Sequence, residues 1–529
     1  MIRRHEQVNW RELLQQIETD PEQAKQTLKN YSSLGKNSDD WQAKIKKESK
    51  QIEAIQGTKW AKPSQVYHVT VSITYNESAQ IIYNSLMAAY EAASGNYANV
   101  FAFISQEQRM GEKYNRETIE TVRKLAGDKF NIQVFQEDDL KIVYETNHNQ
   151  LTDYTYKQDI QISADKLNVF FTAHPDGLVG EIKGSGPNAN WGARQASLLL
   201  AHLKIDPEMA ILTKLDADHR LGPNYLEQLT YNYILNPAHP QVGFEPVPIF
   251  INNYNETGIV PRIVGIQSTF WIMTQSILPQ EFHFFMCYAV PIHTLREAGF
   301  WYREVISEEC FVFYQCYLHY NGEFRTHPVY APIMVDAVEG ATFLDTLGNQ
   351  YKQLQRWAWG AIEEFPYIFT RLFILKEGEK IDTRERIRLI YLNFTNSIFW
   401  ATSGPVFGLG VFLPAWLGGN EYSSMPISLS LKNISSTFMY LSFSLLVFSI
   451  YINFYYLAPK IIQKELNLKP KNTNVGPVKM FFRRLYLASQ VLFSPIVYIT
   501  IMPLPAIDAQ VRGLLGKYLG YWVTPKGGK

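Results

Sequence analysis

The pattern of hydrophobic and polar positions divides the chain into successive parts. The first part is polar and helix-rich, with apolar residues at loosely helical spacing among many charges, as in WQAKIKKESKQIEAIQ. Such a pattern predicts a helical leader that is either solvated or docked. Alternating short strands and helices follow, and long apolar stretches come last. We therefore predict a leader at 1–65, a globular domain at 66–384, an apolar helical region at 385–507 and a tail at 508–529.

The globular part alternates between two periodicities. Five β-branched or aromatic runs have the length of strands: VYHVTVSITY, NVFAFIS, NIQVFQ, NVFFTAH and MAILTKLDAD. Helical stretches such as SAQIIYNSLMAAYEAAS, RETIETVRKLAG and NWGARQASLLLAHLK lie between several of them. This alternation predicts an α/β domain with a mostly parallel sheet covered by helices, and a ligand site beyond the carboxyl ends of the strands.

Charged residues are absent from three stretches near the C-terminus. Each stretch exceeds the roughly 20 residues that cross the hydrocarbon core of a bilayer. We predict transmembrane segments at about 388–417, 434–458 and 485–506, and we expect prolines to kink the first and the third. Buried core helices are the alternative, but a core helix does not require so long an uncharged stretch three times over.

Basic residues set the predicted orientation. Those of the linker at 459–484 are Lys460, Lys464, Lys469, Lys471, Lys479, Arg483 and Arg484. Because basic loops stay on the cytoplasmic side, the linker and the globular domain are both predicted to be cytoplasmic, in a multi-pass protein of the inner or plasma membrane. A third segment that crosses fully would export the basic tail, so we favour a re-entrant or interfacial one. No apolar run follows the basic N-terminus, and no secretory signal is predicted.

Composition narrows the classes of partner. The 50 Lys and Arg residues balance 50 Asp and Glu residues, giving a formal net charge of zero, and this balance disfavours a nucleic-acid partner. The three cysteines, Cys287, Cys310 and Cys316, lack the spacing of a metal site and fit a reducing compartment.

The first candidate for chemistry is the pair of aspartates that ends the run MAILTKL, Asp216 and Asp218. Two carboxylates at a strand end suit Mg²⁺ or Mn²⁺ bound together with a substrate diphosphate. Turn or cap aspartates are the simpler alternative. Further on, Glu308 and Glu309 follow the strand-like run EVIS at the start of a predicted helix. Their negative charges either stabilise the helix through its dipole, or one of them acts as a general base.

Two further patterns are candidates for ligand contacts. QxxRW, formed by Gln353, Arg356 and Trp357, lies on a predicted helix just before the apolar region. A snorkelling arginine and an interfacial tryptophan would explain it without chemistry. The glycine-rich stretch HPDGLVGEIKGSGPNANWGARQ places Lys183 and Asn188 ahead of a helix, where they can face a phosphate. A surface loop explains that stretch equally well.

The order of these motifs resembles the family 2 glycosyltransferases with transmembrane helices, the group of the cellulose, chitin and hyaluronan synthases and the ceramide glucosyltransferases. VSITYNES is similar to that family's donor-binding VxxPTYNE, with Thr74 and Tyr75 kept and Ile73 replacing proline. The aspartate pair matches DxD, and QxxRW matches in full. Two departures are Glu309, where the family has aspartate, and the second strand, where only Glu107 lies near the place of the family's acidic residue.

The resemblance implies a nucleotide-diphospho-sugar transferase (GT-A-like) fold and an inverting, metal-dependent transfer of sugar. The donor would be a nucleotide-diphosphate sugar, most often a UDP-sugar, and the acceptor a membrane-associated lipid or glycan. Glu309, or else Glu308, would be the base, and Mg²⁺ or Mn²⁺ would bind Asp216 and Asp218. The implied donor contacts are Thr74, Tyr75, Glu77, Glu107, Lys183, Asp216, Gln353, Arg356 and Trp357.

Three interpretations of this activity compete. A polysaccharide-synthase-like enzyme is favoured by QxxRW. A non-processive transferase acting on a ceramide- or polyprenyl-type lipid is favoured by the small number of membrane segments. The third is a catalytically silent, membrane-anchored scaffold of the same fold. Because three segments are few to enclose a glycan channel, secretion of a polymer would require a homo-oligomer or a partner.

Overall fold

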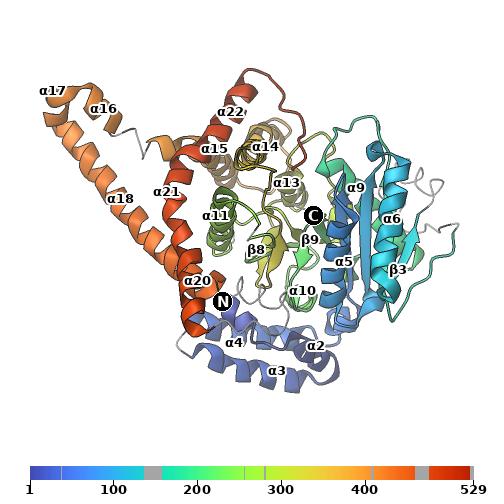
Figure 1. Cartoon of the computed structure of the whole chain (residues 1–529). Coiled ribbons are helices and arrows are strands. Elements are labelled where there is room, and N and C mark those ends of the chain that lie inside the picture. Colours follow the sequence, from blue (N-terminus) through green and yellow to red (C-terminus); the bar gives the residue numbers. More distant parts are fainter. Residues whose placement is uncertain are drawn as a thin grey trace.

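The computed structural model describes residues 1–36, 38–135, 156, 158–254, 256–278, 281–406, 410, 412–458 and 476–524. In Figure 1 the leader helices lie at the bottom, the main sheet with its helices at the right, and the long helices of the C-terminal part at the left. The basic linker at 459–484 and the tail at 508–529 lie partly outside the described residues.

The leader is docked rather than solvated. Its helices are α1 (Ile2–His5), α2 (Trp10–Thr19), α3 (Pro21–Asn30) and α4 (Asp39–Ala54). Trp10 and Trp41 are buried in the same hydrophobic core as one face of the sheet domain, and the Trp10 ring lies 5.0 Å from that of Tyr231 in α10 (Tyr225–Ile234). The loosely spaced apolar residues of the leader thus find their partners in the neighbouring domain.

The central sheet has eight strands in the order β10-β7-β9-β5-β1-β2-β4-β3. All pairs are parallel except those that β9 makes with β5 and β7. The strands are β1 (Tyr67–Thr74), β2 (Val100–Glu107), β3 (Phe130–Val134), β4 (Leu167–His174), β5 (Ala210–Asp216), β7 (Val242–Pro246), β9 (Tyr288–Pro291) and β10 (Arg325–Val329). The predicted α/β class with a mostly parallel sheet is confirmed, and all five predicted strands are present.

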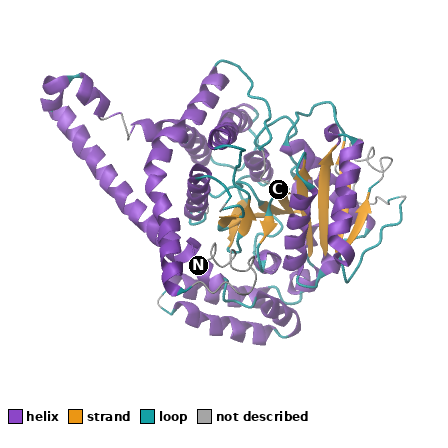
Figure 2. Ribbon diagram, in the orientation of Figure 1, coloured by secondary structure: helices purple, strands orange, loops and turns teal. Residues whose placement is uncertain are grey.

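Helices cover both faces of this sheet (Figure 2). Alternate residues of β2 pack on opposite sides: Ala102 and Ile104 belong to the core beneath α5 (Ala79–Ala93) and α6 (Glu112–Ala126). Phe101 and Phe103 belong to the core beneath α9 (Ser185–His202) and α13 (Glu308–His319). Burial on both faces explains why the strands read as continuous apolar runs.

A smaller sheet, in the order β6-β11-β8, lies next to the carboxyl end of β5. Its strands are β6 (Arg220–Leu221), β8 (Ile249–Ile251) and β11 (Ile333–Val335). The run EVIS, read as strand-like from the sequence, is not a strand. Its Ile306 gives its backbone N–H to the carboxylate of Glu363 instead of to a strand partner, and the run forms the loop that leads into α13.

Long helices make up the C-terminal part (Figure 1). They include α14 (Phe343–Phe369), α15 (Thr383–Pro405), α16 (Phe412–Leu417), α17 (Gly419–Ser424), α18 (Pro426–Ile452), α20 (Pro477–Ser489), α21 (Ser494–Ile496) and α22 (Pro503–Leu514). The first predicted segment is divided between α15 and α16, and residues 407–409 and 411 between them lie outside the described part. Turns of 3-10 and π-helix occur near Pro495 and Pro503, where kinks were predicted.

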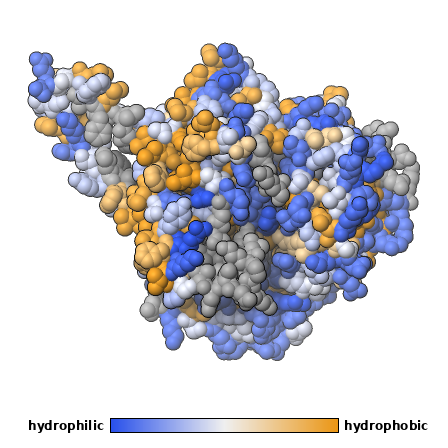
Figure 3. Space-filling model, viewed as in Figure 1, coloured by the Kyte–Doolittle hydropathy of each residue, from blue (hydrophilic) through white to orange (hydrophobic). Residues whose placement is uncertain are grey.

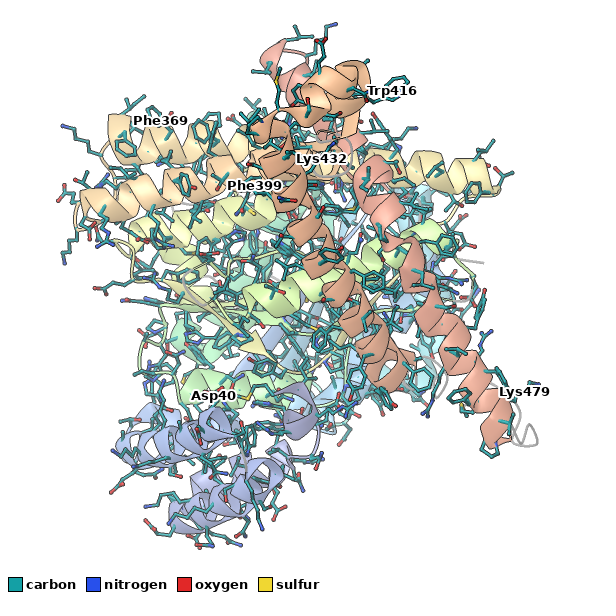
Figure 4. The ribbon with its side chains drawn as sticks, turned by 90° about the vertical axis from the view of Figure 1, so that its left-hand side faces the viewer. Asp40, Phe369, Phe399, Trp416, Lys432 and Lys479 are labelled. Carbon is teal, nitrogen blue, oxygen red and sulfur yellow. The ribbon has the colours of Figure 1, made fainter. Side chains whose placement is uncertain are left out.

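Among the described helices, the run Pro477–Leu514 is long and apolar enough to cross a membrane, and it contains the third predicted segment. Leu446–Tyr455, within the second, is a shorter apolar helix. Hydrophobic residues gather over the C-terminal helices, whereas the leader is mainly hydrophilic (Figure 3). Figure 4 shows α18 and the run that begins near Lys479 lying side by side in front of α14 and α15. The crossing of three segments stays a prediction.

Candidate active site

A pocket opens where β1 and β5 end, as the parallel sheet predicts. It is lined by Ile73, Thr74, Tyr75, Glu77, Glu107, Arg109, Gly184, Ser185, Asn188, Lys214, Asp216, Ala217, Asp218, Glu309, Arg356, Tyr521, Val523 and Thr524. The structure therefore brings together residues from all four motifs: the first donor motif, the aspartate pair, the glutamate pair and QxxRW. Their roles stay predictions, whereas their proximity is a feature of the fold.

Three side chains beside the end of β5 form a group that suits a divalent cation. Asp216, Asp218 and His219 each offer one ligand atom, and these atoms lie within 4.8 Å of one another. Asp218 is buried, and its Oδ2 accepts the backbone N–H of Asp336 at 2.8 Å. Carboxylate oxygens with an imidazole nitrogen form a donor set that binds Mn²⁺ and related metals. Sequence reasoning missed His219, although it directly follows the aspartate pair.

Lys214 was also missed, and it is central to the electrostatics. Its Nζ lies 2.9 Å from Asp216 Oδ1, 2.9 Å from Glu308 Oε1 and 3.5 Å from Glu309 Oε1. Burial alone would lower the pKa of Lys214, but these carboxylates outweigh burial and raise it well above its ordinary value. A signal was present in the sequence: within the apolar run, the lysine is two positions before Asp216 and so points to the same face.

The two glutamates at the start of α13 have different surroundings. The Glu308 side chain is 1% exposed, pairs with Lys214 and accepts the hydroxyl of Ser185 at 2.6 Å. The Glu309 side chain is 22% exposed and lines the pocket. Burial and the charge of Glu308 together raise the pKa of Glu309 to about 8, against the opposing effect of Lys214. Glu308 is thus held in place, whereas Glu309 faces the open space.

Arg356 reaches the pocket from α14 and meets the C-terminal tail there. Its guanidinium donates to the Tyr521 hydroxyl at 3.0 Å and lies 5.3 Å from the centre of that ring. Its Nε is buried without a hydrogen-bond partner among the described residues. The tail contributes Tyr521, Val523 and Thr524 to the lining. The sequence did not point to these three residues, because they belong to none of the motifs.

The other end of the pocket is formed by the first donor motif and β2. Glu77 accepts the backbone N–H of Tyr75 at 2.7 Å, and Arg109 lies 4.1 Å from the centre of the Tyr75 ring. The Glu107 carboxylate is 2.8 Å from Arg109 Nε. Arg109, missed from the sequence, therefore joins Glu107 to the aromatic wall. Asn188 donates to the Thr74 carbonyl at 3.2 Å and holds this end of β1 against α9.

Three predicted donor contacts do not line the pocket. The Lys183 side chain is 65% exposed and pairs with Asp176 at 3.4 Å, so the surface-loop alternative describes it better. Gln353 is buried and accepts a hydrogen bond from Gln350 at 2.9 Å. The ring of Trp357 packs beside Phe285, with 6.2 Å between the ring centres. Within QxxRW, only Arg356 reaches the pocket.

Residues 211–458 match the family model described as glycosyl transferase family group 2. The matched part begins in β5 and contains the aspartate pair, the glutamate pair and QxxRW. The match covers a little under half of the chain, and it confirms at family level the resemblance inferred from the motifs. The protein is accordingly a glycosyltransferase.

Two solved structures are similar to this chain at low identity. One is the mannosyltransferase PcManGT from Pyrobaculum calidifontis in complex with GDP-Man and Mn²⁺, with 12% identity, a TM-score of 0.37, and coverage of 82% of this chain and 87% of that one. The other is GalNAc-T7 with UDP, GalNAc and Mn²⁺, with 10% identity, a TM-score of 0.29, and coverage of 51% and 44%. A comparison with curated proteins finds no match.

Proposed function

We propose that the protein transfers a sugar, with inversion, from a nucleotide-diphosphate sugar to an acceptor hydroxyl at the membrane. The observation that carries this proposal is that Glu309, Asp216, Asp218 and Arg356 line one pocket at the carboxyl end of the sheet. One displacement at the anomeric carbon needs one base on one side and stabilisation of the leaving diphosphate on the other. Glu309 is the candidate for the base, and Asp216, Asp218 and Arg356 are the candidates that stabilise the leaving diphosphate.

Asp216 and Asp218, with His219 beside them, are the residues that would hold Mg²⁺ or Mn²⁺. Such an ion would neutralise the negative charge that develops on the diphosphate. Arg356 supports the same end of the reaction, because its charge is fixed and its buried Nε offers an N–H to a phosphate oxygen. The donor nucleotide would then extend towards Tyr75 and Arg109, a wall of aromatic and cationic character.

Glu309 is the proposed base. In its ionised form it takes the proton of the acceptor hydroxyl while that oxygen attacks the anomeric carbon and the bond to the diphosphate breaks. Its raised pKa makes it a stronger base than an ordinary glutamate. Glu308 suits a supporting role better, because its carboxylate is already bound by Lys214 and Ser185.

The acceptor is proposed to be a lipid or a glycan at the cytoplasmic face of the inner or plasma membrane, reached by a protein with several membrane segments. The helices that follow α14 are the support for this placement, since they expose large apolar side chains over their length. A polysaccharide-synthase-like activity is our first candidate. Addition of a single sugar to a ceramide- or polyprenyl-type lipid is the second.

The test is an assay of the full chain in mild detergent with Mn²⁺ or Mg²⁺. A panel of nucleotide sugars is screened for metal-dependent release of the nucleoside diphosphate, with Glu309→Gln as the inactive control. Release with one donor supports the proposal, and the size of the product separates polymer from single addition. Absence of both release and donor binding across the panel would contradict it and favour the silent scaffold.

A further inference from the structure

One face of α14 does more than present Arg356 to the pocket. Positions 356, 360 and 363 recur at the spacing of a single helix face, and this face lies against the loop that leads into α13. A Cβ atom added to Gly360 would lie 2.6 Å from the Oγ of Ser307. The absence of a side chain at Gly360 therefore permits the close approach of α14 to the beginning of α13.

Glu363, the next residue on this face, holds the loop through its backbone. Its Oε2 accepts the N–H of Ile306 at 2.9 Å, and its Oε1 accepts the indole N–H of Trp359 at 3.0 Å. Ser307 precedes the first turn of α13 but makes no side-chain capping hydrogen bond. A carboxylate from another helix thus binds the backbone one residue before the N-cap of α13. Ile306 itself is buried beside Trp359.

The geometry matters because Glu308 and Glu309 are the first two residues of α13. Whatever fixes the backbone at Ile306 also fixes the direction in which Glu309 points. Arg356 lies two turns before Glu363 on α14, so one helix orients both the proposed base and the cation that faces the leaving group. A shift of about 1 Å between such groups costs up to about a hundredfold in rate.

We propose that Glu363 is a positioning residue of the transferase, which holds the start of α13 so that Glu309 faces the pocket across from Arg356. This inference rests on the proposed function. It assigns Glu363 no contact with substrate. It predicts that Glu363 acts on the chemical step and leaves donor binding unchanged, because the Glu363 carboxylate binds Ile306 and Trp359, whereas the residues proposed to hold the donor are Arg356 and those of β1, β2 and the end of β5.

The decisive variant is Glu363→Gln, which keeps the shape of the side chain. A glutamine has an NH2 donor in place of one carboxylate oxygen and carries no charge, so one of the two bonds is lost and Ile306 is held less strongly in either orientation of the amide. We expect kcat to fall about tenfold or more, with the donor Kd and the thermal midpoint unchanged. Gly360→Ala, which displaces Ser307 and leaves Glu363 intact, should give the same pattern. Trp359→Phe is the matched control: it removes the other donor to Glu363, keeps the bond to Ile306 and should retain kcat.

Glu309→Gln is measured in parallel, so that two kinds of failure are distinguished. If Glu363→Gln keeps full kcat while Glu309→Gln is inactive, the positioning role is wrong and the proposed function stands. If Glu309→Gln also keeps full activity, the proposed function itself is wrong. A Glu363→Gln protein that loses donor affinity or unfolds together with its activity overturns the inference as well, because a general loss of structure then accounts for the effect.

Discussion

The ammonium of Lys214 lies 2.9 Å from a carboxylate oxygen of Glu308, and each side chain is 1% exposed. This buried pair joins β5, which carries the candidate metal ligands, to α13, which carries the candidate base. Breaking a buried pair by removing one partner leaves an uncompensated charge and costs about 3–5 kcal/mol.

Lys214→Met is therefore expected to lower the free energy of unfolding by about that amount. Lys214→Met combined with Glu308→Gln should recover a large part of the loss, since no unpaired carboxylate then remains in the Glu308 position. Thermal unfolding in detergent measures the stability of the single and the double variant relative to the wild type. A double variant as unstable as the single one would show that the pair is not the source of the stability.

The pH dependence of kcat/KM reports the ionisation of groups in the free enzyme. Since the pKa of Glu309 is raised to about 8 by burial and by Glu308, its basic form becomes populated as pH rises through about 8. We expect kcat/KM to increase over that range in the wild type. Glu309→Asp should shift the profile, and Glu309→Gln should abolish the rise while donor binding persists. A flat profile from pH 6 to 9 would remove Glu309 from the role of base.

The raised pKa of Glu309 also affects the stability of the fold, in the opposite direction: activity rises with pH, whereas stability falls. A carboxyl group with a raised pKa binds its proton more tightly in the folded than in the unfolded protein. Its favourable contribution is complete below the unfolded pKa and is lost as pH rises towards 8. Between pH 5 and pH 8 the denaturation midpoint of the wild type should therefore fall further than that of Glu309→Gln, which has no ionisable group at this position.

Asp218→Asn tests the cation site with little change in shape. The amide oxygen can still accept the N–H of Asp336, which Asp218 binds at 2.8 Å, but the negative charge is lost. We expect the Mn²⁺ concentration for half-maximal activity to rise at least about tenfold, as hard cations prefer charged oxygen ligands. Unchanged metal dependence would place the ion elsewhere, and chelation of the wild type provides the reference.

Tyr521→Phe removes the hydroxyl that accepts a hydrogen bond from Arg356. In the proposed function this bond competes with the donor diphosphate for the guanidinium. A hydrogen bond to a charged group contributes about 1.5–3 kcal/mol, so the variant should bind nucleoside diphosphate more tightly, by about tenfold or more. Isothermal titration distinguishes the outcomes, because weaker binding would show instead that Tyr521 supports the donor.

The membrane placement is tested on α18, where the Phe443 side chain is 64% exposed. A lysine at the centre of a membrane helix costs about 2.5–3.5 kcal/mol of insertion. Phe443→Lys should therefore reduce the carbonate-resistant fraction in membranes. Asn433→Lys, next to Lys432 near one end of α18 (Figure 4), is the matched control and should have no effect. Equal behaviour of the two variants would argue against α18 as a membrane span.

Strand positions and motif order were predictable because both leave local signals. Buried parallel strands appear as apolar runs, and the carboxyl end of such a run, as at Asp216, is where an α/β sheet binds ligands. The glutamate pair lies at the start of a helix, as predicted, although the strand predicted before it is a loop. Local patterns also predicted the helix that carries QxxRW, and the family match confirms the resemblance that these motifs gave.

Long-range contacts account for part of what sequence reasoning missed, whereas Lys214 and His219 lie beside the aspartate pair in the sequence. Tyr521 meets Arg356 only because the chain returns to the pocket after the last long helix, and no local pattern marks such a return. Lys183 looked like a phosphate ligand because it follows glycines, yet its side chain points to solvent and pairs with Asp176. The run EVIS has the composition of a strand but finds its hydrogen-bond partner on α14, which only tertiary packing decides.

Thr524 lines the pocket together with Tyr521 and Val523. A fluorescent label or an affinity tag inserted next to residue 524 would therefore begin within a few residues of the proposed donor site, where its bulk would hinder the nucleotide. The leader helices lie at the bottom of the molecule in Figure 1, and the pocket lining includes none of their described residues. Labels for this enzyme are therefore better placed on the leader than around Thr524.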